Sequence, residues 1–185
     1  MAAKNAYGQS LSAPAPSSQV QPATPAPDAK AAVSAYVRQG DRAFAEGKYS
    51  EAIAAYTKAL ELFDTNEYAY YNRGNAYRKL KDYPKAIADL TKAIQLDPQN
   101  TFSYLYRGMA YQADNQVEKA IADYTALIKI DPQQPLAFLR RAEAYASQKQ
   151  RDLATADFRE ASSLYKRQGD RVRAERVETQ LRLLK

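Results

Sequence analysis

The sequence contains no cysteine, histidine or tryptophan, and it has 2 methionines among 185 residues. Without cysteine there is no disulfide, no thiolate nucleophile and no cysteine-based zinc site. Without histidine the chain lacks the commonest general base and metal ligand. No glycine-rich phosphate-binding loop is present either. These absences argue against an enzyme, and the sequence indicates no catalytic residue, no metal site and no cofactor.

Long apolar runs are also missing. No segment approaches the roughly 20 apolar residues of a membrane-spanning helix, and the N-terminus lacks the apolar core of a signal peptide. As it stands, the sequence predicts a cytoplasmic protein without a transmembrane segment. A periplasmic or membrane-tethered location is the alternative if a signal or an anchor has been removed, because Ala/Pro-rich tethers often follow such segments.

The N-terminal segment 1–32 is dominated by alanine, proline, serine and glutamine. Its Ala-Pro pairs favour extended backbone, and so few large apolar side chains cannot offset the entropy lost on ordering. The composition therefore predicts a disordered Ala/Pro-rich tether over residues 1–32.

Charge is unevenly spread along the chain, whose net charge is +6. Segment 33–164 is nearly neutral, whereas segment 165–185 carries seven basic and three acidic side chains. A basic end of this kind is compatible with nucleic acid or an anionic surface. Three acidic residues interrupt it and no aromatic residue follows Tyr165, so a solvated helix is the favoured interpretation and nucleic-acid binding stays the alternative.

Most of the chain is organised by a repeat. Segment 67–100 aligns without a gap with segment 101–134, and Gly74 matches Gly108 while Pro98 matches Pro132. The same period extends in both directions, although the outer units match less closely. Self-similarity at a fixed period of this size indicates stacked supersecondary units. The sequence thus predicts four units, at 33–66, 67–100, 101–134 and 135–168.

The pattern resembles the tetratricopeptide repeat (TPR) family, in which aromatic and small residues recur at fixed positions before a closing proline. The second unit carries this pattern at Tyr70, Gly74, Tyr77, Ala86, Leu90, Ala93 and Pro98. Departures occur at Leu127, where the family has alanine, and at Asp64 and Lys166, where it has proline. The resemblance implies an all-α fold, a right-handed TPR superhelix in which every unit is a helix, a turn and a second helix.

Two further features fit such a solenoid. Glycine or alanine recurs where the two helices of a unit would cross, as at Gly74 and Ala86, and small side chains there let the helix axes approach closely. The last stretch, 169–185, has a narrow apolar stripe and an otherwise charged surface. A solenoid needs a polar-backed end over its last apolar face, so we expect a capping helix.

Arginine and aspartate also recur in register. Arg73, Arg107 and Arg141 are each followed sixteen residues later by an aspartate, and the first unit lacks both partners. Because the two residue types are present or absent together, we predict an ion pair between the two helices of one unit, such as Arg107 with Asp123.

The resemblance also implies a binding surface, because the first helices of TPR units line a concave groove. The family's groove positions fall off the packing stripe of each helix, and a stripe of exposed aromatic and apolar residues favours a binding surface. The same positions include Asp41, Arg78 and Glu143. The residues expected to bind a peptide are Tyr68, Tyr71, Asn72, Asn75, Phe102, Leu105, Tyr106, Met109, Leu136, Leu139 and Arg140.

Some family members hold the C-terminal carboxylates of heat-shock chaperones with a clamp of two lysines, two asparagines and one arginine. In the better of two alignments this chain matches that clamp only at Asn75 and Arg140, so the clamp is not carried over. The sequence therefore predicts a non-catalytic scaffold or adaptor that binds another protein or peptide segment, as a subunit or assembly factor of a larger complex. The alternative occupants of the groove are the tether and a second copy of the chain, which would make a homo-oligomer.

Overall fold

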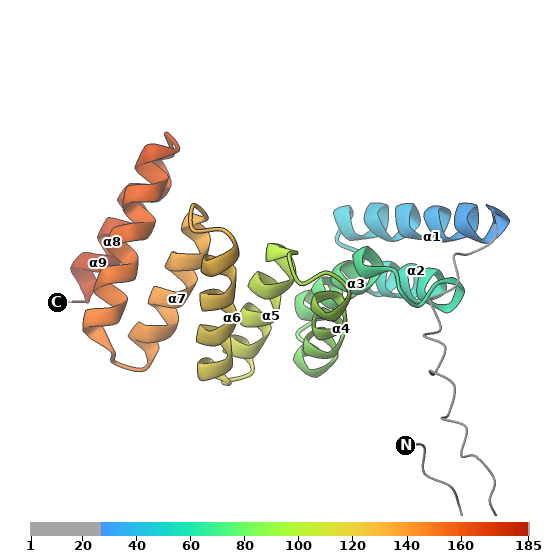
Figure 1. Cartoon of the computed structure of the whole chain (residues 1–185), viewed down its shortest axis with the longest axis horizontal. Coiled ribbons are helices and arrows are strands. Elements are labelled where there is room, and N and C mark those ends of the chain that lie inside the picture. The colour runs from blue at the N-terminus through green and yellow to red at the C-terminus, as the bar shows by residue number, and fades with distance from the viewer. Residues whose placement is uncertain (1–26, 185) are drawn as a thin grey trace, which may run out of the picture.

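The computed structural model describes residues 27–184, and within that range the chain consists of nine helices and no strand. Consecutive helices pack against each other, and Figure 1 shows them as a row that follows chain order, with α1 and α9 at opposite ends. The helices are α1 (Pro27–Ala45), α2 (Tyr49–Leu62), α3 (Glu67–Lys79), α4 (Tyr83–Leu96), α5 (Thr101–Ala113), α6 (Val117–Ile130), α7 (Pro135–Ser147), α8 (Arg151–Arg167) and α9 (Arg171–Leu183).

The expected end of the tether at residue 32 needs a correction. Helix α1 begins at Pro27, so residues 27–32 are helical rather than part of a tether. Proline suits the first turn of a helix because its missing N–H has no partner there, and Asp28 complements the positive helix end. The remainder of the expected tether, residues 1–26, lies outside the described residues.

The ends of the helices follow from their capping residues. Asn66 and Asn100 accept hydrogen bonds from the backbone N–H groups of Ala69 (2.9 Å) and Ser103 (3.1 Å), which starts α3 and α5. Two residues after the end of each first helix, at the same repeat position, stands a residue with positive φ, namely Gly47, Lys81, Asn115 and Lys149. A left-handed residue at this point satisfies the last carbonyls and turns the chain into the second helix.

Small residues bring the two helices of a unit together, as the sequence predicts. A Cβ atom added to Gly108 would lie 2.6 Å from Cε1 of Tyr124, and one added to Gly74 would lie 2.8 Å from Cγ of Leu90. Both large side chains come from the second helix of the same unit and are fully buried. Glycine is therefore required where the aromatic or leucine side chain fills the contact.

The first helices lie on the inner side of the row. Contacts join α1 to α3, α3 to α5 and α5 to α7, whereas successive second helices have no comparable contact in the described part of the chain. The row therefore curves toward the first helices. At its end, α9 packs on α8 and buries Ala174 and Val177 against Ala161 and Tyr165.

Candidate functional site

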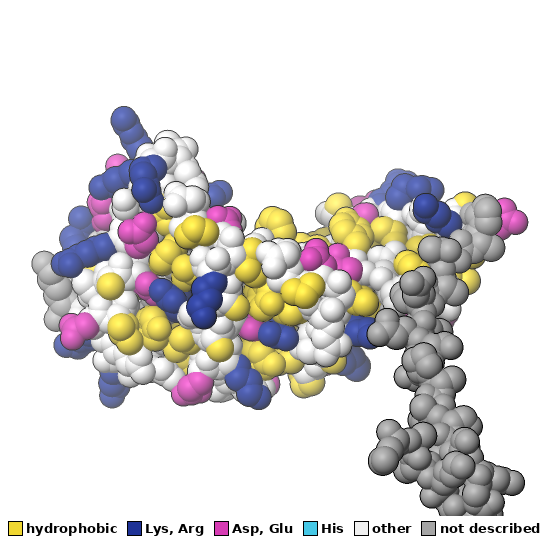
Figure 2. Space-filling model, viewed as in Figure 1, with side chains coloured by type: hydrophobic (Ala, Val, Ile, Leu, Met, Phe, Trp, Pro, Cys, Tyr) yellow, Lys and Arg dark blue, Asp and Glu magenta, His cyan; other side chains and the backbone are white. Residues whose placement is uncertain are grey.

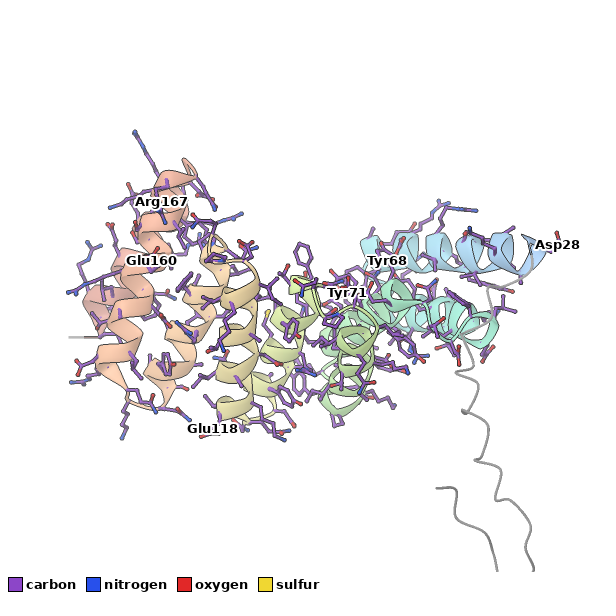
Figure 3. All side chains as sticks on the ribbon, in the orientation of Figure 1. Asp28, Tyr68, Tyr71, Glu118, Glu160 and Arg167 are labelled. Carbon is purple, nitrogen blue, oxygen red and sulfur yellow. The ribbon has the colours of Figure 1, made fainter. Side chains whose placement is uncertain are left out.

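A line of four aromatic side chains runs along the inner side from α3 to α5. The Tyr71 ring stacks on Tyr106, with ring centroids 5.7 Å apart and planes 14° from parallel, and it also lies 6.4 Å from Phe102 and 6.2 Å from Tyr68. We call Tyr68, Tyr71, Phe102 and Tyr106 the aromatic row. Figure 3 shows Tyr68 and Tyr71 together on α3, with Tyr68 on the side of α1.

The outer members of the aromatic row are accessible. Tyr68 is 47% exposed and Phe102 is 52% exposed, whereas Tyr71 and Tyr106 are partly buried against the core between α4 and α5. The Tyr68 hydroxyl donates to Asp41 at 3.3 Å, and Asp41 also accepts from Tyr56 at 2.7 Å. Burial raises the pKa of Tyr71 and of Tyr68 above the ordinary tyrosine value, so both phenols are neutral near pH 7.

The two asparagines expected to contact a ligand have different environments. Asn72 is partly exposed, and its amide donates to the carbonyl of Tyr68 in its own helix at 2.9 Å, while its side-chain oxygen accepts from no residue between 27 and 184. Asn75 is buried, and its oxygen accepts from Nε and Nη2 of Arg78 at 3.2 and 2.7 Å. Asn75 therefore positions Arg78 instead of offering a free polar group to a ligand.

Leu105, like Asn75, is buried and is not available to a ligand, contrary to the expectation from the sequence. It is 3% exposed and belongs to the core cluster of Tyr124 and Leu127, so its side chain is packed between helices. The Leu105 side chain packs against the next unit, because Ala137 and Ala144 of α7 belong to the same core cluster. Met109 packs on the same cluster but remains partly exposed.

The remaining three expected residues line a pocket at the other end of the inner side. Leu136, Leu139 and Arg140 come from α7, and the opposite wall is Arg173, Arg176, Val177 and Gln180 from α9. Tyr165 and Glu143 complete the lining, and the pocket volume is about 460 Å³. The structure therefore divides the expected residues into an aromatic part on α3 and α5 and a basic part between α7 and α9.

Sequence reasoning missed the role of the cap in this second part. The sequence favours a solvated helix for Arg173 and Arg176, and it predicts no contact for Arg78. A signal was available only for Arg78, which falls on a groove position of the family pattern. The contribution of α9 depends on how the cap packs on α8, and no repeat pattern encodes that packing.

Other kinds of site find no support among residues 27–184. No group of three acidic, histidine or cysteine side chains there could hold a metal ion. Nor does any described helix combine the length and the apolar character needed to cross a membrane.

The comparisons with known proteins agree with the repeat pattern. Family models described as tetratricopeptide repeat match residues 67–100 and 90–122, and one described as TPR repeat matches residues 40–81. The comparison with curated proteins found no match. Hundreds of solved protein chains match, and three of them illustrate the similarity.

The first TPR domain of the human RPAP3 protein is 30% identical over 64% of this chain and 96% of that chain, with a TM-score of 0.60. The first TPR of Spaghetti (RPAP3), solved with the HSP90 peptide SRMEEVD, is 29% identical over 64% of this chain and 94% of that chain, with a TM-score of 0.62. MamA is 27% identical over 74% of this chain and 80% of that chain, with a TM-score of 0.72. The helix pairs, the repeated glycine contacts and these matches all agree. The chain belongs to the tetratricopeptide repeat family.

Proposed function

We propose that this protein is a non-catalytic scaffold that binds a segment of a partner protein along the inner side of its helix row. The observation that carries the proposal is the accessibility of the aromatic row. Tyr68 and Phe102 are about half exposed although every repeat has its own filled core. Aromatic side chains bury large areas at a small entropic cost, which makes them good anchors for a ligand.

The similar solved structures support the same class of function. The TPR of Spaghetti is described as bound to an HSP90 peptide, and the second TPR domain of human RPAP3 as in complex with an HSP70 peptide. In this chain Met109 adds adaptable packing next to the aromatic row, and the free oxygen of Asn72 can accept a hydrogen bond from a ligand backbone. Leu136 and Leu139 offer further apolar contact where the inner side continues toward α9.

The experiment starts from a display library of short randomised peptides selected on the full chain. A selected peptide is then measured by fluorescence anisotropy against a variant with Tyr68→Ala and Phe102→Ala. Because both side chains are about half exposed, thermal melting followed by circular dichroism should change little. Loss of two anchor contacts should weaken binding by at least about tenfold.

The matched control carries Leu62→Ala and Leu153→Ala. These leucines are 45% and 50% exposed, but they lie on the second helices α2 and α8, outside the aromatic row. The control should bind the peptide like the wild type. A library that yields no binder, or a selected peptide that is lost in the control and kept in the aromatic variant, would contradict the proposed function.

A further inference from the structure

Arg78 differs from the other partly buried arginines of the repeats in having no carboxylate partner. Arg73, Arg107 and Arg141 each form a two-pronged pair with an aspartate of the same unit. Arg78 donates only to the neutral amide oxygen of Asn75, and no acidic side chain among residues 27–184 lies within ion-pair distance of it. A partly buried charge without a counterion raises the free energy of the folded protein, because it loses contact with water and gains no ion pair. Charged groups in such environments are found more often at functional sites than elsewhere.

The surroundings of Arg78 hold its guanidinium in place rather than neutralise it. The group lies over the ring of Tyr106, 4.9 Å from the centroid, and Tyr106 in turn stacks on Tyr71. Burial lowers the pKa of Arg78, and the like charge of Arg140 lowers it further. Two positive side chains therefore share one region of the inner side, next to the end of the aromatic row.

Arg140 continues this positive region toward the cap. Its Nη1 pairs with Glu143 at 2.9 Å, but its Nε is buried without a hydrogen-bond partner among the described residues. Glu143 also accepts from Gln180 of α9 at 3.4 Å, so its negative charge is shared. Beyond it, Arg173 and Arg176 face the same pocket from α9. We call Arg78, Arg140, Arg173 and Arg176 the arginine row.

Glu143 is the one acidic side chain in the pocket lining, against three arginines. Arg78 and Arg140 are partly buried, and such charges attract a negative ligand group more strongly than the same charges on an open surface, because solvent screens them less. Arg173 and Arg176 are exposed, and Nε of Arg173 also pairs with Asp170 at 3.2 Å. Arginine is also the side chain best suited to bind a carboxylate through two parallel hydrogen bonds.

From this geometry, and resting on the proposed function, we infer that the bound segment is an acidic peptide whose apolar side chains lie on the aromatic row and whose carboxylates lie on the arginine row. Because Tyr106 belongs to the aromatic row and touches Arg78, an apolar anchor and an acidic residue must be close in the ligand sequence. Arg78, Arg173 and Arg176 are then specificity residues, and the capping helix forms part of the binding surface.

The test uses the peptides selected on the full chain together with copies in which each Asp is replaced by Asn and each Glu by Gln. Binding of the acidic peptides to the wild type should weaken about tenfold on this replacement, since a charge-assisted hydrogen bond is lost. In Arg78→Gln the same replacement should weaken binding clearly less than in the wild type, because one partner charge is already absent while Arg140, Arg173 and Arg176 remain. Arg78→Lys should restore part of the difference.

The control variant is Arg167→Gln. Arg167 pairs with Glu160 on α8, and Figure 3 shows both far along the row from Tyr71. It should keep the full difference between acidic and neutral peptides. Circular dichroism melting checks that each variant is folded, and a combined Arg173→Gln and Arg176→Gln variant, whose residues are exposed, provides a second measure if Arg78→Gln unfolds.

The outcomes separate this inference from the proposed function. Selected peptides that need the aromatic row but contain no acidic residue, or whose acidic residues do not couple to Arg78 or to Arg173 and Arg176, overturn the inference and leave the scaffold function standing. Loss of dependence on the aromatic row overturns both. Tight binding of single-stranded DNA that depends on the arginine row, with no acidic peptide bound, would assign the row to nucleic acid and also overturn the inference.

Discussion

Arg107 and Asp123 form a two-pronged ion pair between the two helices of the third repeat. Nε and Nη2 of Arg107 donate to the two carboxylate oxygens of Asp123 at 2.9 and 2.7 Å, and both side chains are largely buried. Nη1 donates to Thr91 of the preceding repeat at 3.0 Å, so the same guanidinium also joins consecutive units. The pairing within one unit, which the sequence predicts, is confirmed.

Replacing one member of this pair should lower the free energy of unfolding more than replacing both members together. Asp123→Ala leaves a buried guanidinium without its carboxylate and should lower the free energy of unfolding by about 3 kcal/mol. A combined Arg107→Met and Asp123→Leu variant should recover most of that loss, because no buried charge remains. Urea unfolding measures both. The exposed pair of Arg167 and Glu160 is the control, and Glu160→Ala should change the unfolding free energy by less than about 0.5 kcal/mol. Equal losses in the single and double variants would contradict this account.

Gly108→Ala tests the close contact between helices. Helix propensity alone favours alanine by about 1 kcal/mol in a helix interior. The added Cβ would meet the buried ring of Tyr124 at 2.6 Å, however, so overpacking should dominate and destabilise the protein by about 1–3 kcal/mol. The fourth repeat has Ala142 at this position, and Ala142→Gly is the matched reverse change. A Gly108→Ala variant with a raised urea midpoint would show that the helices can separate without cost.

In the turns inside the repeats, a substitution is expected to stabilise the protein. Lys149 has a φ of 60°, a region that costs a residue with a Cβ about 1–2 kcal/mol. Lys149→Gly relieves this strain but gives the unfolded chain more freedom, so a net gain of about 0.5 kcal/mol is expected. Gly47 occupies the same position in the first repeat with a φ of 75°, and Gly47→Lys should be destabilising. Thermal melting of the two variants should move in opposite directions.

The fold could be predicted from the sequence because its determinants recur. Glycine at 74 and 108, the paired arginines and aspartates, and the apolar stripe of α9 all carry a periodic signal. The left-handed residues at 81 and 149 are lysines, which give no such signal, whereas Gly47 and Asn115 are residue types that favour this conformation. The hydrogen bonds from arginine to Thr57, Thr91 and Thr125 were not anticipated either, although threonine recurs at that position.

The candidate site was less accessible to sequence reasoning, because pattern position does not determine burial. Leu105 and Asn75 occupy groove positions of the family pattern, yet both are buried. The tight packing of α7 on α5 and α6 covers Leu105, and the long side chain of Arg78 folds back onto Asn75. Figure 2 shows hydrophobic side chains over the middle of the molecule, many basic side chains toward the α8 end and a smaller group over α1, a distribution that averaging over repeats conceals.

The capping helix supports the last prediction. Ala174 and Val177 of α9 are fully buried against Phe158, Ala161 and Tyr165 of α8, with Leu181 and Leu184 partly buried on the same cluster. Ending the chain after residue 168 would expose this apolar face of the last repeat. The truncated protein should therefore unfold at a lower urea concentration than the full chain and should self-associate on size-exclusion chromatography, as expected for a solenoid without its end cap.

Two single substitutions test whether the buried face of α9 stabilises the last repeat. Val177→Ser places a hydroxyl in the buried contact and should cost about 2 kcal/mol of unfolding free energy. Val172 lies on the same helix but is 70% exposed, so Val172→Ser should have almost no effect. A truncated chain that remains monomeric with an unchanged midpoint, or equal effects of the two valine substitutions, would show that α9 does not cap the solenoid.

Val177 also lines the pocket between α7 and α9, and Arg173 and Arg176 stand on the same helix. Val177→Ser should therefore weaken the binding of acidic peptides more than Val172→Ser does, because the stability of the cap determines the shape of that pocket.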